Sequence, residues 1–205
     1  MTKENLRENF ELLVKPYDPN WLLYWKEIEE SYLSKGRYYH NLDHLAMMVA
    51  FALKHQEQIE QIDVLLFSIF YHDIVYKATA KYNEEESAAL AMNRLGKLGL
   101  EFFKMEKVKV QILATKSHLE SNDPDTDLLL DMDLAILGQE FEIYDTYRKN
   151  VRKEYSKFPS LLYNRGRKKL LKQFLSMPYI FKTQIFREKY EKQARANISQ
   201  ELERM

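Results

Sequence analysis

Apolar residues recur at the spacing of an α-helix in almost every segment of this 205-residue chain. Two clear stripes open the sequence: Leu6, Phe10, Leu13 and Val14, followed by Trp21, Trp25, Ile28 and Tyr32. Side chains three or four positions apart share one face of a helix, so these stripes predict amphipathic helices. Gly and Pro number only 5 each, too few for the many turns of a β-sandwich or barrel. We therefore expect an all-α fold.

The same pattern predicts where individual helices begin and end. Asn20 is a suitable N-cap for the second helix, and Gly36 closes it. The next two helices are expected at about 41–55 and 57–75. One helix then runs from 84 to about Gly96, and another follows Gly99 and ends at about 118. The remaining helices are expected at 125–138, 139–157, 160–176 and 183–204. No internal repeat, low-complexity tract or composition shift marks a linker. A single domain covering 1–205, built as a helical bundle, is the expected organisation.

Composition narrows the classes of function. The chain has no Cys, which excludes disulfides, thiolate metal sites and cysteine nucleophiles. Lys plus Arg and Asp plus Glu number 31 each, so no net charge attracts nucleic acid or an anionic membrane. The first ten residues carry charges where a signal peptide needs an apolar stretch. The longest apolar run, Val64 to Tyr71, is too short to cross a bilayer, and we expect a soluble cytoplasmic protein.

Histidines occupy two positions of chemical interest. His40 and His44 lie four residues apart, so on a helix they share a face one turn apart. His72 and Asp73 end the most apolar stretch of the chain. An ionisable pair in such a place must be satisfied by hydrogen bonds, by a partner charge or by a metal, because burying it alone is costly. A lone histidine is more often a hydrogen-bonded residue than a ligand, and His55 is interpreted in that way.

Two carboxylates are embedded in a second apolar run. Asp131 and Asp133 flank Met132 within a segment of leucines, alanine and isoleucine. Either could be a ligand, and taken alone they could be a cap and a solvated residue. Neutral imidazoles together with carboxylates suit divalent ions of borderline hardness, such as manganese, iron, cobalt or zinc. The ordered combination of these elements is more informative than any one of them.

In this order the residues resemble the HD superfamily of metal-dependent phosphohydrolases, whose signature is a His, a His-Asp doublet and a distal Asp on separate helices. The resemblance covers 37–138, and a further segment could extend it to Glu191, Arg195 and Asn197. It implies an HD-type bundle with a core at 37–138 and C-terminal helices, 139–205, packed on that core. The matching motifs read Arg37-Tyr38-Tyr39-His40-Asn41, His72-Asp73-Ile74-Val75-Tyr76, Asn83-Glu84-Glu85-Glu86-Ser87-Ala88 and Asp133-Leu134-Ala135-Ile136-Leu137-Gly138.

The resemblance also implies a ligand set for one divalent metal ion, whether manganese, iron, cobalt, nickel, zinc or magnesium. The implied ligands are His44, His72, Asp73 and one of Asp131 or Asp133. Asp133 is favoured because related HD enzymes place this ligand directly before Leu or Arg-Leu. Binuclear relatives supply additional histidines before the last Asp, whereas this chain has only His118 there, which favours a single tightly held ion.

The segment from Tyr39 to His44 is similar to one in cyclic-nucleotide phosphodiesterases, which implies that His40 is a proton donor. The glutamine segment by which those enzymes clamp the nucleotide is not evident, so a cyclic nucleotide does not follow. Catalytic candidates are therefore His40, Asp73 and Glu84, with Glu84 interpreted equally well as a first-turn residue that complements the helix dipole.

Arg37, Asn83 and His118 are the candidates for binding substrate. A guanidinium matches phosphate with two hydrogen bonds, although a surface charge explains Arg37 at least as well. A helix-end hydrogen bond explains His118 somewhat better than a substrate contact does. The expected function is metal-dependent hydrolysis of a small phosphorylated molecule, a nucleotide or a phosphomonoester, through a water that the metal activates.

Two alternatives remain open at this stage. One is a non-catalytic HD module that binds a nucleotide or a partner protein, and the other is a helical scaffold in which the histidines only pack. The basic run at 165–169 is interpreted as a solvated helix face rather than as a nucleic-acid site. The charged helix at 183–204 is expected to pack on the bundle and could also support a homodimer.

Overall fold

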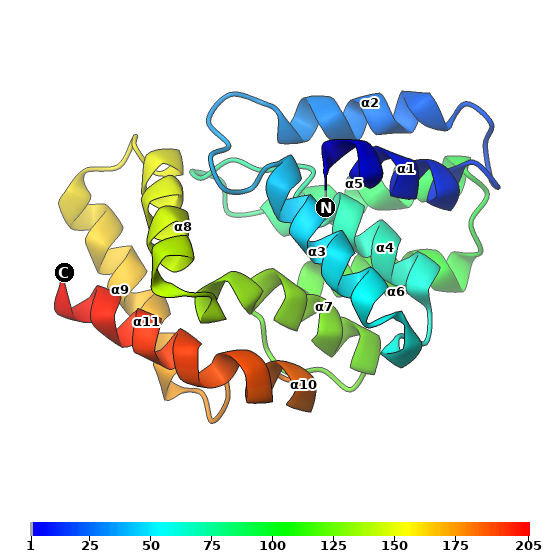
Figure 1. Cartoon of the computed structure of the whole chain (residues 1–205). Coiled ribbons are helices and arrows are strands. Elements are labelled where there is room, and N and C mark those ends of the chain that lie inside the picture. The colour runs from blue at the N-terminus through cyan, green and yellow to red at the C-terminus, as the bar shows by residue number, and fades with distance from the viewer. Residues whose placement is uncertain (1) are drawn as a thin grey trace. The chain divides into compact units, whose positions relative to one another are not determined.

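The computed structural model describes residues 2–205, and over this range the secondary structure is helical and contains no strand (Figure 1). The expectation of an all-α fold is therefore confirmed. Contacts group the chain into two compact units, Met1–Leu129 and Leu130–Met205. Neither the HD type of the bundle nor the single-domain organisation is tested by this division. Both remain predictions.

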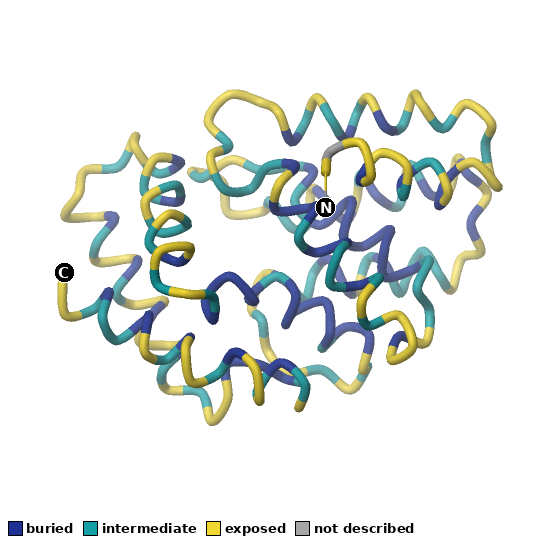
Figure 2. The backbone as a smooth tube through the Cα atoms, in the orientation of Figure 1, coloured by how far each residue is buried: buried dark blue, intermediate teal, exposed yellow. Residues whose placement is uncertain are grey.

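The first unit contains α1 (Lys3–Val14), α2 (Trp21–Tyr32), α3 (Leu42–Lys54), η1 (Gln56–Gln58), α4 (Ile62–Tyr71), α5 (Asn83–Lys97) and α6 (Phe102–Ala114). Helix α4 packs on α3, α5 and α6. Every residue of α4 from Val64 to Tyr71 is buried, and Figure 2 shows the buried backbone gathered in α3 and α4. The most apolar run of the sequence is thus the centre of this unit, as its composition predicted.

Helix α7 (Pro124–Leu134) starts in the first unit, and the division between the units falls within its length. Asp125, in the first turn of α7, is fully buried and links α7 to the start of α4 by hydrogen bonds. The two carboxylate oxygens of Asp125 accept the N–H groups of Glu60 at 2.8 Å and Gln61 at 2.9 Å. These N–H groups belong to the two residues that precede α4, where no helical carbonyl is available to accept them. Asp125 therefore acts as a remote cap for α4.

The fourth helix differs from its prediction at both ends. It was expected over 57–75 but begins at Ile62, after the short 3-10 turn η1, and ends at Tyr71. Past Tyr71 the backbone groups find other partners, since the N–H of Asp73 donates to the Tyr32 hydroxyl at 3.2 Å. The carbonyls of Asp73 and Ile74 accept from Arg37. These interactions from distant residues replace the helical hydrogen bonds.

The second unit contains η2 (Ala135–Gly138), α8 (Phe141–Glu154), α9 (Ser160–Ser176), α10 (Gln184–Phe186), the π-helical turn η3 (Arg187–Glu191) and α11 (Lys192–Glu203). Helix α11 packs on η2 and α9. At its centre Arg167 forms a buried ion pair with Glu201, with Nε to Oε1 at 2.9 Å and Nη2 to Oε2 at 3.1 Å. The Tyr144 hydroxyl also donates to Glu201.

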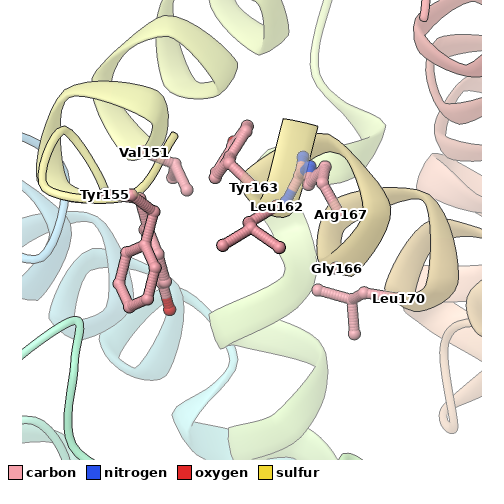
Figure 3. Close-up of a pocket in the computed structure, with 8 residues that line it drawn as sticks. Val151, Tyr155, Leu162, Tyr163, Gly166, Arg167 and Leu170 are labelled. Carbon is pink, nitrogen blue, oxygen red and sulfur yellow. The ribbon is translucent and has the colours of Figure 1, made fainter. Parts of the chain in front are cut away.

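A pocket of about 310 Å³ opens in the second unit beside α8 and α9 (Figure 3). Its walls are mostly aromatic and aliphatic side chains, and none of the residues proposed from the sequence for metal, catalysis or substrate lines it. The lining residues are Val151, Tyr155, Phe158, Leu162, Tyr163, Gly166, Arg167 and Leu170.

Candidate metal centre

Asn41 places His44 in the first turn of α3. The side-chain oxygen of Asn41 accepts the N–H groups of Asp43 at 2.9 Å and His44 at 3.3 Å, so Asn41 is the N-cap of this helix. Such a cap satisfies N–H groups that have no partner inside the helix. The His44 side chain is then turned inward, and the residue is only 3% exposed.

His72 follows directly after α4 and is held in one orientation. Its Nδ1 lies 2.8 Å from the carbonyl oxygen of Ile69, which can only accept a hydrogen bond. Nδ1 therefore carries a proton, and in the neutral ring Nε2 carries the lone pair. His72 is 1% exposed. An imidazole with its proton fixed on Nδ1 by a carbonyl is a common arrangement for a metal ligand that binds through Nε2.

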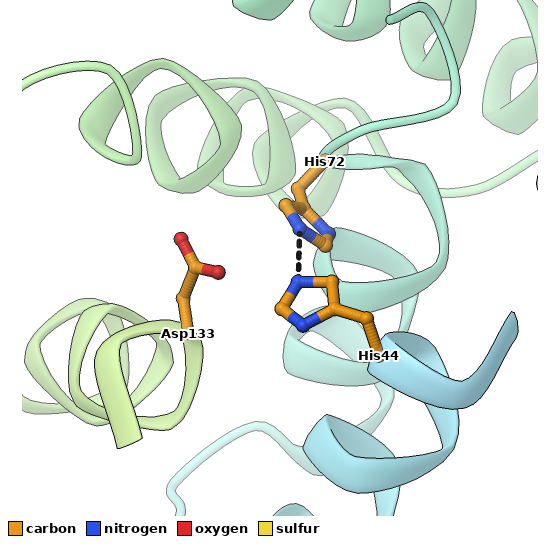
Figure 4. Close-up of side chains that lie close together, drawn as sticks. All are labelled: His44, His72 and Asp133. Atoms are coloured by element: carbon orange, nitrogen blue, oxygen red, sulfur yellow. Dashed lines mark hydrogen bonds between the residues drawn. The ribbon is translucent and has the colours of Figure 1, made fainter. Parts of the chain in front are cut away.

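The Nε2 atoms of His44 and His72 face each other at 3.3 Å (Figure 4). His44, His72 and Asp133 each offer one ligand atom, and these three atoms all lie within 4.8 Å of one another. Asp133 belongs to the last turn of α7. Two imidazole nitrogens and one carboxylate oxygen could hold a divalent ion of borderline hardness. This group contains three of the residues that the sequence suggested as ligands.

Asp73, the other predicted ligand, lies beside this group rather than in it. Its Oδ2 is 3.4 Å from Nε2 of His72 and 4.0 Å from Nε2 of His40, and its side chain is 14% exposed. The carboxylate thus lies between a buried histidine and a more accessible one. Its predicted roles, as a ligand and in orienting water, remain predictions.

His40 lies at the accessible side of the site, with 22% of its side chain exposed. Its ring stacks on the ring of Tyr76, with centroids 4.3 Å apart and planes inclined by 28°. The stacking and the neighbouring Asp73 carboxylate fix the position of an imidazole that water or a small molecule can reach. This placement is compatible with the predicted role in proton transfer, which stays a prediction.

Asp131 has a separate set of partners within the second unit. Its Oδ1 accepts the N–H of Lys182, and its Oδ2 accepts the N–H and the hydroxyl of Thr183, all at 2.7 Å. Burial raises the pKa of Asp131 to about 6, although these hydrogen bonds act in the opposite direction. Both oxygens are therefore engaged in fixing the turn before α10. Asp133, and not Asp131, is in the group that could hold a metal.

Two of the predicted substrate-binding residues make contacts with the backbone. Asn83 accepts the N–H of Lys77 and donates to the carbonyl of Lys77, both at 3.0 Å. Arg37 donates to three carbonyl oxygens near the site. The hydrogen bonds of Arg37 hold the segments that carry His40 and Asp73. A contact of either residue with substrate remains a prediction.

The other two candidates lie at helix ends. Glu84 is in the first turn of α5, where its charge complements the helix dipole. His118 follows α6 in a left-handed conformation with φ 52°, and its N–H donates to the carbonyl of Ala114 at 3.1 Å. Neither belongs to the group of possible metal ligands. Their predicted roles in proton transfer and substrate binding stay predictions.

The segment Glu191, Arg195 and Asn197 is structural in the second unit. Glu191 accepts the N–H groups of Ile180 and Phe181, and Arg195 donates to Glu191 at 2.7 Å. Asn197 donates to the carbonyls of Leu137 and Gln139, both at 2.8 Å. These polar residues satisfy backbone groups at the turns of this unit.

Sequence reasoning missed two aromatic residues of the site. Tyr32 accepts the N–H of Asp73 and donates to the carbonyl of Phe70 at 3.3 Å, and Tyr76 stacks on His40. Tyr32 belongs to the apolar stripe of its helix. Its ring is enough to explain its place in that stripe, so the sequence gives no sign that its hydroxyl makes a specific hydrogen bond. The appearance of Tyr76 in the same motif as His72 was the only sequence signal for its role.

Comparisons with known proteins found no match in a scan of family models, in a search of curated proteins or in a search of solved structures. Within residues 2–205 no helix is both long enough and apolar enough to span a bilayer. The likeness to the HD superfamily therefore continues to rest on the sequence motifs.

Proposed function

We propose that this protein is a metal-dependent phosphohydrolase of the HD type that acts on a small phosphorylated molecule. The observation that carries the proposal is the arrangement of His44, His72 and Asp133, whose ligand atoms lie within 4.8 Å of one another. His44 and His72 are the histidines that the motifs assign as ligands, and Asp133 is the favoured distal carboxylate. Motif and geometry thus point to the same three residues.

The spacing of the two histidines fits a metal ion. Two nitrogens that each lie about 2.0–2.1 Å from one tetrahedral ion are about 3.3 Å apart, and the observed separation of Nε2 from Nε2 is 3.3 Å. The hydrogen bond from His72 Nδ1 to Ile69 leaves Nε2 able to bind. A donor set of two nitrogens and one oxygen admits manganese, iron, cobalt, nickel or zinc, with magnesium least suited to imidazole.

A bound divalent ion supplies Lewis-acid polarisation of a phosphoryl oxygen and makes water a better nucleophile near neutral pH. The chain itself supplies positioning and proton transfer. In this proposal the Asp73 carboxylate, 14% exposed and 3.4 Å from His72, accepts a proton from an attacking water. His40, 22% exposed, donates a proton to the oxygen of the leaving group, so that the phosphoester bond breaks without releasing an alkoxide.

Metal analysis of the purified full-length chain tests the proposal. Wild type is expected to carry about one equivalent of a divalent ion and to release phosphate from at least one member of a phosphoester panel supplemented with manganese, cobalt or nickel. His72→Ala is expected to lose both. His55→Ala is the matched control, because His55 lies at the far end of α3, at its C-cap, and should retain both.

Two outcomes would contradict the proposal in different ways. Wild-type protein that binds no divalent ion, or that binds it equally well after His72→Ala, would overturn the metal site. Protein that binds the ion through His72, and is stabilised by nucleotides but turns over no phosphoester with any of the metals, would favour the alternative of a non-catalytic binding module.

A further inference from the structure

Arg37 joins the two segments that carry the predicted metal ligands. Its Nη1 donates to the carbonyl of His40 at 3.2 Å and to that of Asp73 at 2.7 Å, and its Nη2 donates to the carbonyl of Ile74 at 2.9 Å. His40 lies just before α3, which carries His44, whereas Asp73 directly follows His72. One guanidinium therefore spans the two ligand segments through their backbones.

These carbonyls have a physical need for such a partner. Asp73 and Ile74 lie beyond the end of α4 at Tyr71, so their carbonyls have no place in its hydrogen-bond ladder. Backbone carbonyls in partly buried surroundings cost free energy when they lack a donor. The planar, forked guanidinium can donate in several directions at once, whereas the single ammonium of Lys cannot reproduce that fork.

Two aromatic rings hold the guanidinium in place. Its central carbon lies 4.8 Å from the ring centroid of Tyr32 and 5.4 Å from that of Tyr76, both within range of a cation–π interaction. Each ring also contacts one of the two segments, since the Tyr32 hydroxyl accepts the Asp73 N–H and Tyr76 stacks on His40. Arg37, Tyr32 and Tyr76 thus form one connected support.

We propose that Arg37 is a positioning residue that sets the separation of the His40–His44 segment from the His72–Asp73 segment, and thereby the affinity and ligand field of the metal site. The inference rests on the proposed function. It replaces a phosphate-binding role for Arg37 with a structural one, because Nη1 and Nη2 already donate to carbonyl oxygens and Nε is buried. Loss of this support is expected to weaken metal binding without removing any ligand.

The second unit offers a matched control. Arg152 also donates to two carbonyl oxygens, those of Tyr155 at 2.8 Å and Phe158 at 3.2 Å, and its guanidinium lies 4.7 Å from the ring centroid of Tyr163. Arg152→Ala therefore removes a similar set of contacts outside the residues assigned to the metal site. It measures what the loss of such an arginine costs the fold alone.

The experiment is a Co²⁺ titration of the metal-stripped full-length chain, followed by visible absorption, for wild type, Arg37→Ala, Arg37→Lys and Arg152→Ala. Arg37→Ala should bind Co²⁺ about 10–100-fold more weakly, as is usual when a residue that supports metal ligands is lost, and its absorption bands should shift. Added guanidinium ion, at concentrations too low to unfold the protein, should restore part of the affinity. Arg152→Ala should match wild type in affinity and spectrum.

Circular dichroism and thermal melting establish that each variant is folded. If Arg37→Ala does not fold, Arg37→Lys decides the matter, because it keeps the charge and the stem. A folded Arg37 variant with wild-type affinity and spectrum would overturn the positioning role while leaving the metal site intact. Wild-type protein that binds no Co²⁺ would overturn the proposed function and this inference together.

Discussion

The Nε2 atoms of His44 and His72 lie 3.3 Å apart, and both residues are almost completely buried. The His72 lone pair points at His44 because Nδ1 of His72 is committed to the Ile69 carbonyl. Only a proton or a metal cation can lie favourably between the two nitrogens. A buried pair of this kind provides a site whose occupancy should be coupled to the stability of the fold.

Divalent metal should stabilise the protein through this pair. Addition of Co²⁺ or Mn²⁺ is expected to raise the melting temperature of wild type, with about 2.7 kcal/mol of stabilisation at a free concentration 100 times the Kd. His44→Ala and His72→Ala should each abolish the metal-dependent part of this increase. Differential scanning fluorimetry with and without a chelator measures it. An equal increase in both alanine variants would show that the metal acts elsewhere on the chain.

Asp131 and Asp133 should respond differently to the same substitution. Asp133→Asn removes a carboxylate from the candidate metal group and should greatly reduce bound metal, together with the stabilisation that the metal provides. Asp131→Asn should keep the metal but destabilise the fold, since one amide oxygen cannot accept from the N–H groups of both Lys182 and Thr183. Metal content by mass spectrometry and urea unfolding compare the two. The opposite pattern would assign the ligand role to Asp131.

Asp131 should also give the stability a dependence on pH. Burial raises its pKa to about 6 from 3.8, so the folded state holds this proton more tightly than the unfolded state does. The contribution of this carboxyl to the free energy of unfolding is therefore fully present below about pH 4 and is lost as the pH rises to about 6, by on the order of 3 kcal/mol. Urea unfolding of wild type and Asp131→Asn should show that the difference between their free energies of unfolding becomes smaller as the pH rises from about 4 to about 6. A constant difference would contradict the raised pKa.

The buried ion pair of Arg167 and Glu201 should be costly to break from one side. Both side chains are about 95% buried or more, and Tyr144 adds a hydrogen bond to Glu201. Arg167→Met leaves the carboxylate without its cation and should destabilise the fold by about 3–5 kcal/mol. The double variant Arg167→Met with Glu201→Leu should recover much of this loss. Guanidinium chloride unfolding measures both, and an additive double variant would argue against a coupled pair.

The helices were predictable because their signal is local. The apolar stripe and Asn20 predicted the start of α2 at Trp21, although this helix ends at Tyr32, short of Gly36. The predicted range of 160–176 matches α9, Ser160–Ser176. The start of α4 was missed because the N–H groups of the two residues just before it are accepted by Asp125, more than 60 residues away. The spacing of apolar residues predicts where a helix forms, but it does not predict a hydrogen-bond partner from a distant segment.

Only those parts of the candidate site that depend on the chemical type of the side chains could be predicted from the sequence. His44, His72 and Asp133 were named from their motifs, and their ligand atoms do lie together. Asp131 instead accepts hydrogen bonds from the backbone N–H groups of Lys182 and Thr183. No sequence motif indicates these partners. The contacts of Arg37 were missed for the same reason, since backbone carbonyls are present at every position and carry no sequence signal.

Gly138, which ends the motif that begins at Asp133, should be among the least replaceable positions of the second unit. A Cβ built there would lie 2.5 Å from Cβ of Tyr190 and 2.7 Å from its carbonyl oxygen, so η2 can approach η3 only with glycine at this place. Gly138→Ala is expected to destabilise the fold by about 1–3 kcal/mol, the usual cost of overpacking.

Gly166 supplies the matched control for this prediction. It lies inside α9, and within the described residues no heavy atom other than those of its chain neighbours and the adjacent helix backbone lies within 4 Å of a Cβ built there. Gly166→Ala should stabilise the fold by about 0.5–1 kcal/mol, because alanine loses less backbone entropy in a helix than glycine does. Urea unfolding of both variants should therefore give changes of opposite sign. Equal tolerance of alanine at the two positions would show that η2 and η3 can separate at little cost, and would contradict the close approach of Gly138 to Tyr190.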